Sequence, residues 1–381
     1  MRIAYIYTAI LEYGGVDRIL TQKANYLADK MGYEVYIITD SQRDKPTSFP
    51  LSNRVKLIDL DIDFSQEYKY GIVKRFFVYK KLMRLYRKKL TTTLIDIHAD
   101  IVCTVCGRDM DFITKVYDGS KKIGESHIAK EYIRNFHLLS QRGFPYNIIA
   151  YIWRKKFERA VKNLDAFVVL TNRDAKDWSN IKQCEVIPNF VAIYPKITSS
   201  CKNKKVINVG RLSQQKSQEY LIKAWKPIND KYPEWELNIY GEGELYEYLT
   251  SLIKDLGLNR SIHIYPNTRD IEEKYIDSSI FVLSSTFEGF PLVLLEAMRC
   301  GLPCISFDCP NGPKEIIKNG YNGILVENKN LEKLSSAIEE LITDDKKKVG
   351  MGQYALNSMD FYSQDSIMQK WNNLFKRIAQ Q

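Results

Sequence analysis

The fold of this chain is decided by the stretch Ser284-Ser285-Thr286-Phe287-Glu288-Gly289-Phe290-Pro291-Leu292-Val293-Leu294-Leu295-Glu296-Ala297. The apolar run at residues 280–283, just before it, is typical of a strand buried inside a parallel sheet. Pro291 suits the first turn of a helix. The stretch is therefore expected to lead from a buried strand, through a loop, into a helix.

Two carboxylates in this stretch indicate what the loop binds. A helix N-terminus gathers backbone N–H groups and the positive end of the helix dipole, which together hold a diphosphate. We expect the substrate-binding residues at this point to be Gly289, Phe290, Pro291 and Leu292, of which proline has no N–H to donate. Glu288 and Glu296 flank that point, and ionised carboxylates only accept hydrogen bonds. They suit the hydroxyls of a hexose and a ribose, and they do not suit phosphate.

Strand-like and helical segments alternate through both halves of the chain. Its 381 residues exceed the usual length of a domain with a single hydrophobic core, which predicts two domains. Apolar runs in the first half predict strands at residues 3–7, 35–39, 55–60, 101–105, 122–124 and 166–170. A polar segment at residues 194–205 follows and is interpreted as a linker. The pattern restarts at residues 206–209, 237–240, 262–265, 280–283, 304–307 and 324–326, which predicts two doubly wound α/β lobes.

The spacing of Glu288 and Glu296, with seven residues between them, resembles that of the retaining glycosyltransferases of family 4. Three further segments match this family in the expected order: Gly14-Gly15-Val16-Asp17-Arg18, Val209-Gly210-Arg211-Leu212 with Lys216, and Asn311-Gly312-Pro313-Lys314-Glu315-Ile316-Ile317 before Gly320-Tyr321-Asn322-Gly323. The resemblance implies the GT-B fold, in which two Rossmann-like lobes face each other across a cleft. Residues 1–193 would form the acceptor-side lobe and residues 204–360 the nucleotide-sugar lobe. A final helix, within about residues 361–381, would pack back on the first lobe.

Cations near the start of the second lobe are the candidates for transition-state stabilisation. Breaking an anomeric C–O bond leaves a nucleoside diphosphate with growing negative charge, which a positive group must meet. Gly210, Arg211 and Lys216 lie on the loop after that lobe's first strand, where side chains project at the carboxyl ends of the strands. Spacing alone would favour two solvated cations among the many lysines and arginines of the chain. The resemblance assigns Arg211 and Lys216 to the leaving group.

The first lobe contributes a glycine turn, an arginine and a histidine. Gly14 and Gly15 follow the first strand and would let the backbone approach the diphosphate or the acceptor, although an ordinary turn is the alternative. Arg18 would reach the cleft or pair with a neighbour on the surface. The resemblance places a histidine after the strand at residues 122–124, which selects His127 in Gly124-Glu125-Ser126-His127. His127 is expected to bind the donor sugar or orient the acceptor.

Several other chemistries are disfavoured. Tyr240-Gly241-Glu242-Gly243 lacks the third glycine of a dinucleotide fingerprint, which argues against NAD. Asp61-Ile62-Asp63 has the D-x-D form that binds a divalent metal in the other major glycosyltransferase fold. A pattern this short arises often by chance, so it does not indicate a metal site here. The seven cysteines include no zinc-like set, and reduced thiols are expected because no export signal is evident. We therefore expect neither a metal nor a cofactor. The net charge of +10 permits nucleic-acid binding, but no nucleic-acid-binding signature is present.

Residues 72–90 form a basic amphipathic pattern without any acidic residue. Its basic residues are Lys74, Arg75, Lys80, Lys81, Arg84, Arg87, Lys88 and Lys89. Apolar residues recur at helical spacing as Ile72, Phe76, Tyr79, Met83, Tyr86 and Leu90. This apolar stripe either packs on the first lobe or adheres to an anionic membrane. No run of apolar residues is long enough for a spanning helix. The expected location is the cytoplasm, with possible attachment to the inner face of the membrane.

Together these observations predict a metal-independent retaining hexosyltransferase. It would move a hexose or N-acetylhexosamine from a nucleoside-diphosphate sugar, with UDP as the expected nucleotide, to a glycan or a polyprenyl-diphosphate-linked acceptor. Two alternatives stay open. One is a sugar-nucleotide epimerase of the same fold, which would need no acceptor. The other is a catalytically silent subunit that only binds, against which stands the joint presence of Arg211, Lys216, Glu288 and Glu296.

Overall fold

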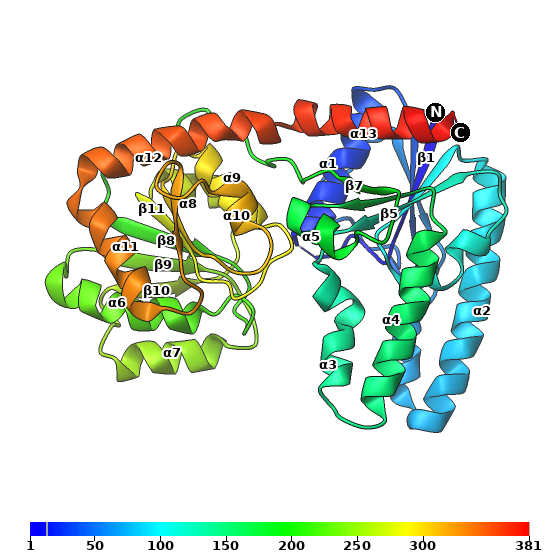
Figure 1. Ribbon diagram of the computed structural model, residues 1–381, viewed down its shortest axis with the longest axis horizontal. Helices are drawn as coiled ribbons and strands as arrows, with labels where there is room; N and C mark the ends of the chain where they lie inside the picture. Colours follow the sequence, from blue (N-terminus) through cyan, green and yellow to red (C-terminus); the bar gives the residue numbers. More distant parts are fainter. Residues whose placement is uncertain (13, 381) are drawn as a thin grey trace. The chain divides into compact units, whose positions relative to one another are not determined.

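The computed structural model describes residues 1–12 and 14–380, apart from the side chain of Ile72. The chain divides into two compact units (Figure 1). The first unit consists of Met1–Ile187 together with Met368–Gln381, and the second unit of Pro188–Ile367. The division thus falls before the polar segment at 194–205 that the sequence indicated as the linker. Gln381 lies outside the described residues.

The first unit is built around a seven-stranded sheet in the order β3-β2-β1-β4-β5-β6-β7. Every neighbouring pair in this sheet is parallel. The strands are β1 (Arg2–Tyr7), β2 (Glu34–Thr39), β3 (Val55–Asp59), β4 (Ile101–Thr104), β5 (Lys121–Ser126), β6 (Ala166–Val169) and β7 (Cys184–Val186). The α-helices are α1 (Gly15–Asp29), α2 (Ile72–Ile97), α3 (Phe136–Ser140), α4 (Tyr146–Lys162), α5 (Asn172–Asp177) and most of α13 (Gln364–Ala379).

The second unit is built around a six-stranded parallel sheet in the order β10-β9-β8-β11-β12-β13. Its strands are β8 (Lys205–Val209), β9 (Glu236–Tyr240), β10 (Ile262–Tyr265), β11 (Ile280–Leu283), β12 (Cys304–Phe307) and β13 (Gly323–Val326). Its helices are α6 (Gln218–Lys231), α7 (Tyr246–Asp255), α8 (Ile271–Ile276), α9 (Leu292–Arg299), α10 (Pro313–Ile316), α11 (Leu331–Thr343) and α12 (Asp345–Ser358). Buried side chains from the strands and from α6, α7 and α11 form its core.

Both units confirm the predicted doubly wound α/β class, and every strand that the sequence predicted is present to within two residues at each end. The central strands are buried along almost their whole length, because helices cover both faces of a parallel sheet. The sequence analysis missed β7, which has only three residues, all half-buried. A run that short carries too little periodicity to indicate a strand.

The order of strands reverses beside the first strand of each sheet. In the first unit the chain runs from β1 to β2 and β3 on one side, and then crosses to β4 on the other side of β1. In the second unit it runs from β8 to β9 and β10, and then crosses to β11 on the other side of β8. Loops after the two strands that flank such a reversal diverge and leave a crevice for ligands. The crevices thus lie after β1 and β4 in the first unit, and after β8 and β11 in the second.

The helix α13 belongs to the first unit from Met368 onward. Tyr33 donates a hydrogen bond to Oδ1 of Asn372 at 2.5 Å, and Arg377 pairs with Glu185 at 2.6 Å. Trp371 and Phe375 are buried on the same helix. Apolar burial and two polar contacts therefore fasten this end of the chain to the first unit.

Two glycines bring neighbouring loops of the second unit into close contact. A Cβ atom added to Gly241 would lie 2.0 Å from the carbonyl oxygen of Gly210, and one added to Gly243 would lie 2.3 Å from that of Leu212. The N–H of Leu212 donates to the carbonyl of Glu242 at 2.9 Å across the same contact. The Gly-Glu-Gly turn after β9 therefore supports the loop after β8 by close backbone approach.

We predict that Gly243→Ala lowers the free energy of unfolding by about 1–3 kcal/mol, because the new methyl group forces two backbone segments apart. Gly350→Ala in α12 is the control: its added Cβ meets nothing within 4 Å, and replacing a glycine inside a helix should stabilise by about 0.5–1 kcal/mol. Urea unfolding followed by circular dichroism measures both. An unchanged midpoint for Gly243→Ala would show that the two loops are not held together as described.

Candidate active site

The loops after β8 and β11 are joined to each other at the reversal point of the second unit. The N–H of Thr286 donates to the carbonyl of Gln215 at 2.9 Å, and Oγ of Ser284 donates to the carbonyl of Lys216 at 2.8 Å. The side-chain amide of Gln215 donates in return to the carbonyl of Phe287 at 3.1 Å. These bonds fix the backbone next to Lys216 and Glu288, the two charged residues described below.

Lys216 and Glu288 form an ion pair with 2.6 Å between Nζ and Oε1. The Glu288 side chain is 6% exposed and that of Lys216 is 20% exposed. The carboxylate is thus nearly enclosed while the ammonium group retains access to solvent. A Cβ added to Gly210 would lie 3.4 Å from the stem of Lys216, so this glycine lies directly against the lysine chain. The sequence analysis assigned Lys216 to the leaving diphosphate and Glu288 to sugar hydroxyls. The structure shows that the two side chains also pair with each other.

The segment from Cys309 to Gly312 packs against the Glu288 loop. The N–H of Glu288 donates to the carbonyl of Pro310 at 3.2 Å. Gly312 has φ of +89°, and an added Cβ would lie 2.5 Å from Cδ of Pro291. The Asn-Gly-Pro-Lys motif quoted from the sequence therefore contains a glycine that lets the loop close over Pro291. The sequence gave no role for this motif, because its contact with Pro291 is long-range.

The helix after the Glu288 loop begins at Leu292, with Pro291 at the preceding cap position in an extended conformation. Gly289 and Leu292 are half-buried, so backbone at this end of α9 remains near the surface. Phe290 is 7% exposed, and its ring centroid lies 5.8 Å from that of Tyr362. The side chain of Phe290 is thus a packing group, and any contact it makes with substrate would come from its backbone.

Glu296 lies in the middle of α9 and is 5% exposed. The hydroxyl of Tyr275, in α8, donates to Oε2 of Glu296 at 3.2 Å. Tyr275 is fully buried and was not identified from the sequence, because no local pattern distinguishes it from a core tyrosine. The carboxylate is therefore held by a hydroxyl donor of the kind that a ribose also offers.

Arg211 takes a different position from Lys216. Its Nε lies 3.5 Å from Oε2 of Glu244, and the two side chains are 72% and 56% exposed. An exposed pair of this kind is weak and leaves the guanidinium free to change partners. The structure therefore brings Lys216, Gly210 and Glu288 together, and it leaves Arg211 at the surface of the same loop.

The loop after β1 in the first unit is organised by Asp17. The Tyr7 hydroxyl donates to one carboxylate oxygen of Asp17 at 2.6 Å, and the N–H of Glu12 donates to the other at 2.9 Å. Burial raises the pKa of Asp17, and these two donors oppose that effect. Gly14 caps α1 and Gly15 is its first residue. The sequence pattern contained Asp17 but did not indicate this role.

Gly14 has room for a side-chain atom among the described residues that are not its chain neighbours. A Cβ added to Gly14 would meet no atom within 4 Å. Arg18 is half-buried, and its guanidinium carbon lies 5.9 Å from the centroid of the Phe49 ring. Gly14 and Arg18 therefore lie on the same turn, with Arg18 directed toward an aromatic ring of its own unit.

His127 belongs to a buried charge cluster at the end of β5. Its Nε2 lies 3.4 Å from Oε2 of Glu125, and the same oxygen is paired with Nζ of Lys23. Burial alone would raise the pKa of Glu125, but the Lys23 charge and the hydrogen bond from His127 outweigh it and the pKa is lowered. Nδ1 of His127 is buried without a hydrogen-bond partner among the described residues. The histidine is thus oriented through Nε2, with Nδ1 left as an acceptor.

The lysine of this cluster comes from α1 and is covered by α13. Lys23 is 2% exposed, and its Nζ lies 3.8 Å from the centroid of the Trp371 ring. Cation–π contact and the Glu125 carboxylate together compensate for removing the ammonium group from water. Sequence reasoning missed Lys23 and Trp371, since they are far apart in the chain and neither stands in a recognisable motif.

Other candidate ligand sets have structural roles. Asp63, of the Asp-Ile-Asp pattern, accepts a hydrogen bond from the N–H of Ser65 at 2.9 Å and pairs with Arg43. All seven cysteines are free thiols, and burial raises the pKa of Cys309 to about 12. Within residues 1–12 and 14–380 there is no group of three His, Cys, Asp or Glu side chains placed to hold a metal. None of the helices described is long and apolar enough to cross a membrane.

Comparison with known proteins finds a family model that matches part of the chain, several relatives and a shared fold. Residues 192–358 match the family model of glycosyl transferases group 1. The chain is 29% identical over 379 residues to an uncharacterized glycosyltransferase of Haemophilus influenzae, covering 98% of this chain and 99% of that protein. It is also 29% identical over 229 residues to the poly(ribitol-phosphate) alpha-N-acetylglucosaminyltransferase of Staphylococcus aureus. That match covers 58% of this chain and 46% of the relative.

Among solved structures, the chain is similar to S. aureus TarM crystallised with fondaparinux, alpha-GlcNAc-glycerol and UDP. The TM-score is 0.77 at 17% sequence identity, and the match covers 98% of this chain and 99% of that chain. At this identity the likeness establishes the fold, which is the GT-B fold of two Rossmann-like units.

We predict that Lys23→Met lowers the free energy of unfolding by about 3–5 kcal/mol, because Glu125 is then buried without its counter-charge. The double variant Lys23→Met/Glu125→Gln should recover most of that loss. Urea unfolding at pH 7 measures both, and Lys56→Met, which removes an exposed pair with Glu34, should leave the midpoint nearly unchanged. If the single and double variants were equally destabilised, the two charges would not be coupled.

Proposed function

We propose that this chain is a glycosyl transferase of group 1, the family whose model matches residues 192–358, and that it transfers a sugar with retention of anomeric configuration. The donor would be a UDP-linked hexose or N-acetylhexosamine. The acceptor would be a glycan or a polyprenyl-diphosphate-linked glycan of the cell surface. The similar proteins support this choice, because one acts on poly(ribitol-phosphate) and another was crystallised with UDP.

The Lys216–Glu288 pair is the observation that carries this proposal. Its two members come from the loops that flank the strand reversal of the second unit, which is where α/β folds bind nucleotides. Lys216 keeps 20% of its side chain exposed, so its ammonium group can contact a ligand while Glu288 holds its position. We propose that Lys216 stabilises the charge that develops on the departing diphosphate, without the need for a divalent metal.

The remaining groups of the second unit divide the donor between them. We propose that backbone N–H groups at the start of α9 bind the diphosphate, because unpaired N–H groups and the helix dipole coincide there. Arg211, held only by an exposed pair, would turn toward the same anion. Glu288 would accept hydrogen bonds from hexose hydroxyls, and Glu296 from the ribose, with Tyr275 fixing its carboxylate.

In the first unit we propose that His127 contacts the transferred sugar or the acceptor. Its Nδ1 is an acceptor that the described residues leave unused, and Glu125 fixes the ring through Nε2. Gly14 and Gly15 would allow substrate to approach the backbone, since a Cβ added to Gly14 meets no described atom within 4 Å outside its chain neighbours. Arg18, on the same first turn of α1, would support binding of an anionic group.

We propose further that the first unit touches an anionic membrane with the start of α2. Tyr86, Leu90 and Leu94 on this helix are buried in the unit. By contrast, Val73 and Phe77 near its start are 72% and 65% exposed. Packing on the first unit therefore describes the later part of this helix, and we propose adhesion to the membrane for its start. The helix continues past the predicted end at residue 90, to Ile97.

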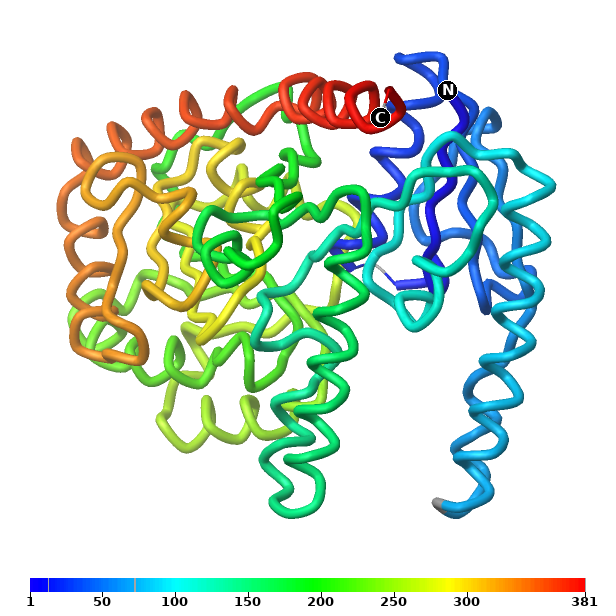
Figure 2. Tube along the Cα trace, turned by 45° about the vertical axis from the view of Figure 1, so that its right-hand side comes forward, coloured from blue at the N-terminus to red at the C-terminus, as the bar shows by residue number. Residues whose placement is uncertain are grey.

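A second element extends from the same unit. The α3–α4 pair and the start of α2 project from the sheet in the same direction (Figures 1 and 2). The turn between α3 and α4 carries Phe144, which is 80% exposed, next to Arg142. Trp153 and Tyr151 on α4 are also more than half exposed. Aromatic side chains next to basic ones are suited to the interface of an anionic bilayer.

Transfer activity is tested by incubating the protein with UDP-, GDP- and ADP-sugars and measuring nucleotide release with and without a glycan extract. We expect UDP release. Lys216→Ala should slow it by about 10²–10³-fold, as for loss of one oxyanion donor. Lys226→Ala, in an exposed pair on α6, is the matched control. Near-normal turnover of Lys216→Ala would remove Lys216 from the mechanism, and conversion of the donor sugar without transfer would favour the epimerase alternative.

Membrane attachment is tested by sedimentation with vesicles of phosphatidylcholine alone or mixed with phosphatidylglycerol. We expect binding only to the anionic vesicles and a loss of binding in high salt, because each basic group near the surface adds about 1 kcal/mol. Phe76→Ser/Phe77→Ser should reduce binding several-fold. Phe361→Ser, equally exposed in the second unit, should not. Equal sedimentation with both vesicle types would contradict an electrostatic attachment.

A further inference from the structure

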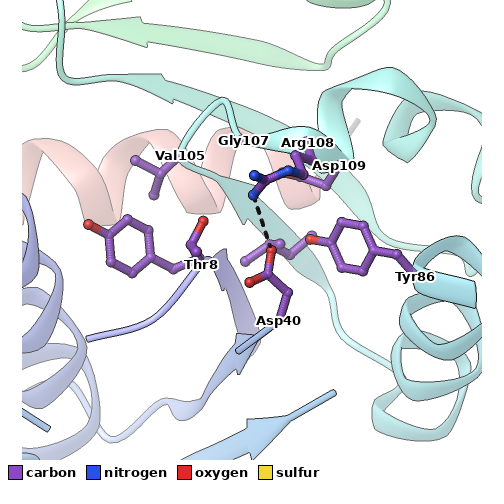
Figure 3. Close-up of a pocket in the computed structure, with 9 residues that line it drawn as sticks. Thr8, Asp40, Tyr86, Val105, Gly107, Arg108 and Asp109 are labelled. Carbon is purple, nitrogen blue, oxygen red and sulfur yellow. Dashed lines mark ion pairs between the residues drawn. The ribbon is translucent and has the colours of Figure 1, made fainter. Parts of the chain in front are cut away.

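The strand reversal of the first unit holds a cavity of about 50 Å³. It lies beside the carboxyl ends of β1, β2 and β4, and Figure 3 shows the side chains around it. The lining residues are Ile6, Tyr7, Thr8, Asp40, Tyr86, Val105, Gly107, Arg108 and Asp109. Its place matches that of the Lys216–Glu288 pair in the second unit, since both follow the first strand of a doubly wound sheet.

Two buried carboxylates on this cavity have oxygens without a donor. Asp40 is 3% exposed and Asp109 is 2% exposed. Among the described residues, Oδ1 of Asp40 and Oδ2 of Asp109 have no hydrogen-bond partner. Burial raises the pKa of each group to about 6. A buried acceptor without a donor costs free energy, and such groups in native proteins are usually completed by water or a ligand.

The backbone around the cavity is arranged to keep these carboxylates in place. A Cβ on Gly107 would lie 2.9 Å from Oδ1 of Asp109, so the glycine leaves room for that oxygen. Asp59 accepts hydrogen bonds from the N–H groups of Gln42 and Arg43 at 3.0 and 2.8 Å, which fixes the loop after Asp40. The carboxylates are therefore positioned by local structure on both sides of the cavity.

Charge and size restrict what can enter. Nη1 of Arg108 lies 4.0 Å from Oδ2 of Asp40 (Figure 3), and this cation disfavours an ammonium group. The two carboxylates in turn disfavour a phosphate. A cavity needs about 10–15 Å³ of space to hold one water molecule, so this cavity of about 50 Å³ admits a few non-hydrogen atoms, such as those of a hydroxymethyl group. Neutral hydroxyls are the donors that satisfy carboxylates in a site of this size.

We propose that this cavity binds the hydroxyl end of the acceptor, so that a hydroxymethyl or hydroxyl group of a sugar or polyol donates to Asp40 and Asp109. The inference rests on the proposed transferase function and specifies its acceptor chemistry. Thr8, at the exposed rim, and the Tyr86 hydroxyl complete the polar lining.

Saturation-transfer NMR with ribitol, glycerol and methyl glucosides tests binding without depending on transfer. We expect wild-type protein to bind at least one of them. Asp40→Asn and Asp109→Asn should each weaken binding about tenfold or more. Thr8→Leu, at the exposed rim, should weaken it without disturbing the core. The control Asp61→Asn changes an exposed acid of the same unit and should bind as wild type.

Lowering the pH from 7.5 to 5 should weaken binding, because a protonated carboxyl loses acceptor capacity. Charged groups that act on the two carboxylates besides each other are Arg108, Asp59, Arg134 and Asp111. The proposal would be overturned if the wild type bound none of these compounds. It would also be overturned if Asp40→Asn, Asp109→Asn and Thr8→Leu all bound as tightly as the wild type, and the cavity would then hold only water. UDP binding, measured in parallel by thermal shift, separates this result from a failure of the donor site, since UDP is assigned to the second unit.

Discussion

The reversal of strand order beside the first strand of each sheet is the constraint on which both candidate sites depend. Because parallel strands present their carboxyl ends on one edge, loops from distant parts of the sequence meet there. Lys216 and Glu288 are separated by 72 residues and are brought within 2.6 Å by this arrangement alone. Asp40 and Arg108 meet in the same way in the first unit. Strand order, more than any local sequence motif, therefore decides which charged residues meet at each candidate site.

Each unit combines a buried carboxylate with a cation, but the two pairs differ in exposure. In the second unit the lysine remains partly open, so its charge is available to a ligand. In the first unit Lys23 is closed off between Glu125 and Trp371, and His127 is the member nearest to solvent. The open lysine therefore suits direct contact with an anion. The closed lysine suits the task of holding a carboxylate ionised so that it can orient a histidine.

The sequence predicted the fold class, nearly all the strands, and the loops that carry Lys216 and Glu288. These features are local: apolar runs mark buried strands, and glycines and prolines mark the turns between them. It did not predict that Glu288 and Lys216 pair, that Tyr275 donates to Glu296, or that Asp40 and Asp109 share a cavity. Those contacts depend on which strands are neighbours and on side-chain packing across helices. Neither is encoded in the spacing of residues along the chain.

The discontinuity of the first unit has a consequence for how the protein is made. Met368 and the residues after it reach their places only after the whole second unit has left the ribosome. Until then Lys23 lacks the Trp371 ring that covers it, and the Lys23–Glu125 pair is open to water. Domains generally fold in the order of synthesis. The charge cluster around His127 is thus completed last, so a nascent chain can contain a folded second unit before Trp371 covers the Lys23–Glu125 pair that orients His127.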